Sequence, residues 1–180
     1  MKLEDIIKKN EEAICEKWLQ LIFKLYPPEV SKFFIQKKDQ FENPVGYIIS
    51  KETKNLFKEL INDFNPEIFI NSLDEIIKIN SIQPVSPSHA IGFIFELKNA
   101  IRYTIKNEII EYGLHNKITD FESKIDKLAL HAFDCYMNIR EKIFNIKIKE
   151  SKAMTFKLVD RININQKKLK KIINQNDKDK

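Results

Sequence analysis

The chain has 180 residues, of which 43% are apolar, and it carries 13 Phe, only three Gly and a formal net charge of +5. This length fits one domain with an appendage. So many large apolar side chains beside so few glycines argue against a loop-rich or all-β protein.

The positive charge is concentrated at the C-terminal end. Residues 151–180 hold nine basic and three acidic side chains, whereas residues 1–150 hold 22 basic and 23 acidic ones. The larger part therefore lacks the net basic character of a nucleic-acid-binding domain, and nucleic acid is not the expected partner. The sequence predicts two parts: a helical domain over residues 1–150, and a basic helical extension with a disordered tail over residues 151–180.

The N-terminal third is predicted to form a helix, a break and a short helix. Leu3 to about Tyr26 has one broad apolar stripe and is predicted to form a single amphipathic helix, which Pro27-Pro28 ends. The apolar piece from Val30 to Ile35 is predicted to add one or two helical turns. We expect its pair Phe33-Phe34 to pack on the first helix.

Three later breaks share one form, in which a capping residue precedes a proline: Asn43-Pro44, Asn65-Pro66 and Ser86-Pro87. A proline is tolerated at the first helical position, where its missing N–H costs nothing. These breaks predict helices near residues 44–63, 66–82 and 87–111. Gly113 is a plausible end for the third. This third helix is apolar almost all round from Ala90, so we expect it in the middle of the core, with Gly92 allowing close packing beneath Phe93 and Phe95.

The last predicted helix begins near Asn116 or Thr119 and runs to about residue 160, so its far end must protrude or break. It carries two apolar stripes. One includes Phe121 and the residues that we predict form a homodimer interface, Ile118, Ile125, Leu128, Ala132 and Ile139. The second comprises Leu130, Phe133, Met137 and Phe144. Two stripes require two partners, which are the core helix and either the first helix or a second copy of the chain.

Three groups of residues, in order over about residues 3–150, carry a family resemblance. They are Ile79, Gln83, Pro87-Ser88, Ala90, Phe93, Phe95 and Leu97-Lys98; Asn43-Pro44-Val45-Gly46; and Ala132-Phe133-Asp134 with Tyr136-Met137 and Arg140-Glu141-Lys142. The chain resembles the RsbRD N-terminal domain family, the sensor-like front domain of RsbT co-antagonist proteins in bacterial stressosomes. The resemblance implies a globin-like helical bundle without haem that acts as a signal-input or dimerisation domain. Co-antagonists continue into a phosphorylated STAS domain, whereas about 30 polar residues follow here.

The sequence shows no catalytic signature. It has no Gly-rich phosphate loop, no paired cysteines and no His-Glu-x-x-His motif, so we expect neither an enzyme nor a metal site. Glu122 and Asp126, one helical turn apart, are interpreted as surface charges. Cys15 and Cys135 are interpreted as buried hydrophobic residues rather than as a redox pair.

A small cluster of polar residues lies at the third break: Asn80, Gln83, Ser86, Ser88 and His89. Either they cap helices and satisfy backbone groups, or they line a ligand pocket. Among the histidines His131 is the best placed for haem, but a partly exposed or hydrogen-bonded role is the default, so we expect no cofactor.

The sequence therefore favours a non-enzymatic sensory or protein-interaction domain that forms a homodimer and binds a further, unidentified protein. No apolar run approaches the roughly 18 residues of a membrane span, and the N-terminus lacks a signal-peptide core, so we expect a cytoplasmic protein without membrane contact. The alternatives are a haem or small-ligand sensor and a protein that associates with nucleic acid through its tail.

Overall fold

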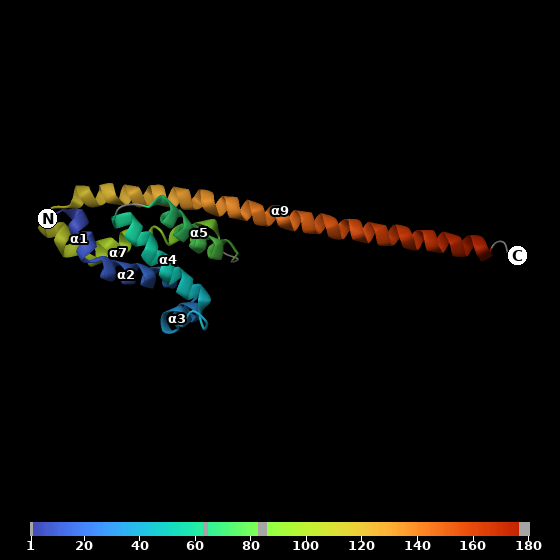
Figure 1. Cartoon of the computed structure of the whole chain (residues 1–180), viewed down its shortest axis with the longest axis horizontal. Coiled ribbons are helices and arrows are strands. Elements are labelled where there is room, and N and C mark those ends of the chain that lie inside the picture. The colour runs from blue at the N-terminus through green and yellow to red at the C-terminus, as the bar shows by residue number, and fades with distance from the viewer. Residues whose placement is uncertain (1, 63–64, 83–85, 177–180) are drawn as a thin grey trace. The chain divides into compact units, whose positions relative to one another are not determined.

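The computed structural model describes residues 2–62, 65–82 and 86–176, and all regular secondary structure within these ranges is α-helical (Figure 1). The all-α class predicted from the sequence is thereby confirmed. The chain divides into two compact units, the first ending at Ile139 and the second beginning at Arg140. The sequence had placed this boundary after residue 150.

The N-terminal segment forms two helices, α1 (Leu3–Lys9) and α2 (Glu11–Lys24), and not the single helix predicted. The break lies at Asn10, whose backbone leaves the helical region with φ −103° and ψ 15°. Its side-chain amide donates to the Ile6 carbonyl at 3.0 Å. Asn side chains compete with the backbone for such bonds, which is why a continuous apolar stripe did not guarantee a continuous helix.

The three proline-marked breaks begin helices as predicted. They start α4 (Pro44–Ile61), α5 (Pro66–Ile82) and α6 (Pro87–Gly92), while α3 (Pro28–Gln36) precedes them. Each capping side chain accepts a hydrogen bond from a backbone N–H in the first turn: Asn43 from Gly46 at 2.9 Å, Asn65 from Glu67 at 3.0 Å, and Ser86 from His89 at 3.3 Å. Local capping chemistry thus determines where these helices begin.

The long core helix predicted over residues 87–111 is in fact divided into α6, α7 (Glu96–Thr104) and α8 (Lys106–Glu111). Between α6 and α7 the backbone tightens into i→i−3 bonds, from Ile94 to Ile91 at 3.0 Å and from Phe95 to Gly92 at 3.1 Å. After α8, Gly113 adopts φ +61°, in agreement with its expected role as a helix end.

Trp18 of α2 occupies the centre of the core and explains the break before α7. Its indole N–H donates to the Phe93 carbonyl at 2.7 Å, and its ring stacks on Phe93 and meets the edge of Phe57. A tertiary hydrogen bond therefore uses a carbonyl that lies within the tightened turn. Phe93, Ile94 and Leu97 are buried, whereas Phe95 is exposed, so this region is not buried on all sides as the sequence predicted.

The last helix, α9 (His115–Asn176), uses its regular apolar stripe inside its own chain. Ile118, Ile125, Leu128 and Ala132 belong to the buried core, and Ile139 packs against that core while partly exposed. The predicted dimer interface made of these five residues is therefore wrong. A three- and four-residue spacing is the same for an intramolecular seam and an intermolecular one, so the pattern alone could not separate them.

The second unit is helical from Arg140 to Asn176, whereas the sequence predicted a helical extension with a disordered tail over residues 151–180. Residues 140–176 contain no Pro or Gly and hold nine Lys, which is a good helix former. Within residues 140–168 all side chains are exposed except those of Ile143 and Ile148, which are partly buried.

Gly92 does not permit the close helix packing that the sequence predicted, because a Cβ placed there would meet nothing within 4 Å. We expect Gly92→Ala to raise the free energy of unfolding by up to about 1 kcal/mol, since alanine restricts the unfolded chain more. At Gly46 a Cβ would lie 2.8 Å from Cγ of the capping residue Asn43, so Gly46→Ala should destabilise the protein. Urea denaturation of both variants measures these opposite changes in the free energy of unfolding. A loss of stability in Gly92→Ala would contradict the finding that the space around Gly92 is open.

Candidate functional site

The polar residues predicted to line a ligand pocket mainly hold helices together. Asn80 is buried; its side-chain amide donates to the Ala90 carbonyl at 2.8 Å and its oxygen accepts from the Tyr26 hydroxyl at 3.0 Å. Ser86 and Ser88 are exposed, with their hydroxyl oxygens 3.1 Å apart. Gln83 lies outside the described residues. The capping interpretation is therefore the one that the hydrogen bonds support.

Of the predicted pocket residues, Asn80 and His89 do line a common cavity, but its volume is only about 10 Å³. A buried water needs at least about 10–15 Å³, so this space is smaller than any sensory ligand. The cavity is mostly apolar and is lined by Ile22, Leu25, Tyr26, Ile49, Ile76, Asn80, His89 and Phe93. The predicted residues are thus not gathered into a ligand site.

The other candidates for chemistry are also accounted for. All three histidines, including His131, are exposed. Burial raises the pKa of the Cys15 thiol to about 11 and, with nearby acidic charge, also raises that of Cys135. A thiol needs its thiolate form to react, so both are poor nucleophiles. The described residues contain no cluster of His, Cys, Asp and Glu able to hold a metal ion.

Glu122 and Asp126, considered above as surface charges, join α9 to α7. The two oxygens of Glu122 accept from Arg102 at 2.5 and 2.7 Å, in the bidentate geometry that favours arginine. Asp126 pairs with Lys98 at 2.5 Å. These ion pairs connect helices of the first unit.

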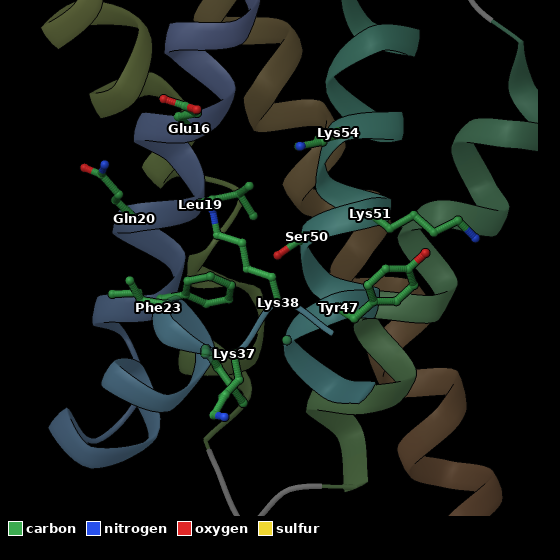
Figure 2. A pocket seen from close by; sticks show the side chains of 13 residues that line it. Glu16, Leu19, Gln20, Phe23, Lys37, Lys38, Tyr47, Ser50, Lys51 and Lys54 are labelled. Atoms are coloured by element: carbon green, nitrogen blue, oxygen red, sulfur yellow. The ribbon is translucent and has the colours of Figure 1, made fainter. Parts of the chain in front are cut away.

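A groove of about 550 Å³ lies between α2, α3 and α4 (Figure 2). Its apolar wall is built on Leu19, Phe23 and Phe34, and the rings of Phe23 and Phe34 lie 5.4 Å apart. The remaining lining residues are polar or lie at the rim: Glu16, Gln20, Ile35, Lys37, Lys38, Gly46, Tyr47, Ser50, Lys51 and Lys54. We call this space the α2–α4 groove.

The lysines of the α2–α4 groove fall into two classes. Lys37 pairs with Glu42 at 3.0 Å, and Lys51 pairs with Glu52 at 3.1 Å. Lys38 and Lys54 form no ion pair with any carboxylate in the described part of the chain. Figure 2 shows Lys38, Lys54 and Ser50 directed into the space between α2 and α4, whereas Lys51 points away from α2.

Glu52 does not offset the charge inside the groove. Burial would raise the pKa of its carboxyl, but hydrogen bonds from Ser72 at 2.7 Å, from Asn55 at 3.0 Å and from Lys51 outweigh burial and lower that pKa. The carboxylate is thus committed to linking α4 with α5 and to neutralising Lys51. The positive charge at Lys38 and Lys54 is left without a counterion.

Sequence reasoning did not find this groove. Ser50 and Lys54 lie one helical turn apart, which is a usable local signal, but Lys37-Lys38 lie in the connection before α4 and Phe23 lies on α2. Only the packing of three helices brings these residues together.

Comparison with protein-family models, curated proteins and solved structures gave no match to this chain. The resemblance to the RsbRD N-terminal domain family therefore stays a prediction. In the part of the chain that the structure describes, no helix has both the length and the hydropathy of a membrane span.

Proposed function

We propose that this chain is a non-enzymatic sensory or regulatory module that acts by associating with a second copy of itself through α9. The observation that carries the proposal is an exposed apolar surface in the first unit. Leu130, Phe133 and Met137 are 68%, 44% and 46% exposed. Their spacing of three and four residues places them on one side of the helix. A group of large apolar side chains on one surface is typical of an interaction site.

The charges beside this surface are compatible with pairing of identical copies. Asp126, Lys127 and Asp134 carry both signs, so a two-fold contact does not bring together residues of one charge only. Residues 140–176 instead hold eleven basic and three acidic side chains. Pairing two copies there would be opposed by like charges, which is why we assign self-association to the first unit.

The second unit offers a surface for a different protein. Phe144, Leu158 and Ile162 are exposed, and the steps between residues 144, 148, 151, 155, 158 and 162 alternate between four and three. Apolar side chains at such steps are typical of helices that pair with another helix, and here the two middle positions are the polar Ser151 and Thr155. The basic side chains around it favour an acidic partner helix. The resemblance to stressosome input domains, with its globin-like fold and signalling role, supports the same general function.

Sedimentation velocity tests self-association. We expect the wild type to sediment at about twice the monomer mass of 21.4 kDa, because the two-fold pairing is the commonest oligomer geometry. Phe133→Glu should weaken the dimer at least about tenfold, since each copy would place a carboxylate in an apolar contact.

The matched control is Ile110→Glu, which adds the same charge at an exposed apolar residue of α8. This variant should remain dimeric. A wild-type protein that is monomeric at high micromolar concentration, or equal weakening by both substitutions, would contradict the assignment to α9.

A further inference from the structure

We propose that the α2–α4 groove binds a small amphipathic anion, a molecule with a carboxylate or similar anionic head and an apolar body. Binding itself does not depend on the proposed self-association. The role of the bound anion as an input signal does rest on that proposed function.

The apolar wall of the groove is already formed in the absence of any ligand. Phe23 and Phe34 are 5% and 8% exposed, and Phe34 is held from two sides by Phe23 and by Tyr26, with ring centroids 5.4 and 5.1 Å away. The volume of about 550 Å³ falls in the range of roughly 300–1,000 Å³ typical of small-molecule sites. An apolar body would therefore enter without reorganising the core.

The polar part of the groove selects charge. Lys38 from the α3–α4 connection and Lys54 from α4 are directed into the same space, and Ser50 adds a hydroxyl that can donate to an anion (Figure 2). Glu16 is the only acidic residue among those lining the groove, whereas Lys37, Lys38, Lys51 and Lys54 are basic. The groove is therefore positive where it is polar.

The combination of these two parts defines the ligand class. Inorganic phosphate would meet the lysines but make no use of the apolar wall formed by Leu19, Phe23 and Phe34. An apolar cation would use that wall but be repelled by two unpaired ammonium groups. Only a molecule with both an anionic head and an apolar body uses both parts of the groove.

Isothermal titration calorimetry with the full chain tests the proposal with three probes. Sodium decanoate should bind, whereas decyltrimethylammonium, which has the same chain length and the opposite charge, and inorganic phosphate should not. In the double variant Lys38→Glu/Lys54→Glu, decanoate should bind at least about tenfold more weakly, because attraction becomes repulsion. Lys117→Glu, on an exposed α9 residue that does not line the groove, should bind like the wild type.

A second variant tests the location of the binding site by filling the groove and not by changing its charge. Ser50→Trp would fill the space between α2 and α4 and should abolish decanoate binding while circular dichroism stays unchanged. The proposal would be overturned if decanoate bound both the charge variant and the volume variant as tightly as the wild type. Equal affinity for the cationic probe, or no heat of binding at millimolar decanoate, would also overturn it. Phe133→Glu separates the two proposals, since it should still bind decanoate. Decanoate binding by a chain that never dimerises would remove only the signalling role.

Discussion

Replacing Ile125 with glutamate is expected to destabilise the folded protein and not to separate two folded copies. Ile125 is completely buried in the core of the first unit. A glutamate there either leaves a carboxylate without a partner in an apolar site or takes up a proton at a strongly raised pKa, and both cost stability. Together with the lost apolar packing, the penalty is on the order of 3–5 kcal/mol, against a total stability of about 5–15 kcal/mol for a typical domain.

The measurement is urea denaturation followed by circular dichroism at a concentration at which the wild type is monomeric, so that dissociation does not contribute. The matched control is Leu130→Glu, five residues later on the same helix but 68% exposed. We expect that variant to stay within about 0.5 kcal/mol of the wild type. If Ile125→Glu instead folded normally and only changed the association state, the intramolecular assignment of this seam would be wrong.

Removing the Trp18 side chain is expected to have the second large effect. Trp18 is fully buried, contacts the rings of Phe57 and Phe93, and donates to the Phe93 carbonyl at 2.7 Å. Trp18→Ala should lower the free energy of unfolding by about 3–5 kcal/mol, since it removes a large aromatic group and leaves a cavity. Thermal and urea denaturation both report this loss.

Trp18→Phe separates packing from hydrogen bonding at the same site. It keeps an aromatic ring but leaves the Phe93 carbonyl, at the break between α6 and α7, without the indole donor. A buried carbonyl without its partner costs about 1–3 kcal/mol, so this variant should fall between the wild type and Trp18→Ala. Stability equal to that of the wild type would mean that the indole hydrogen bond contributes nothing to the position of this break.

The sequence by itself was sufficient to predict a structural feature wherever the residues that determine it are neighbours in the chain. The Asn43, Asn65 and Ser86 caps form the hydrogen bonds expected of them, and Gly113 adopts the left-handed conformation that ends α8. These features depend on a side chain and the backbone within three residues of it, so no distant partner can alter them easily.

Tertiary structure decided the features that depend on partners distant in sequence. The spacing of Ile118, Ile125 and Ala132 is the same whether a helix packs inside one chain or between two, and only the folded unit shows that these residues are internal. At the break after Gly92, the Phe93 carbonyl accepts a hydrogen bond from the indole of Trp18, 75 residues away, a partner that the local sequence does not reveal. The α2–α4 groove likewise exists because three helices place Phe23, Lys38 and Lys54 around one space, a proximity that no periodicity within a single helix encodes.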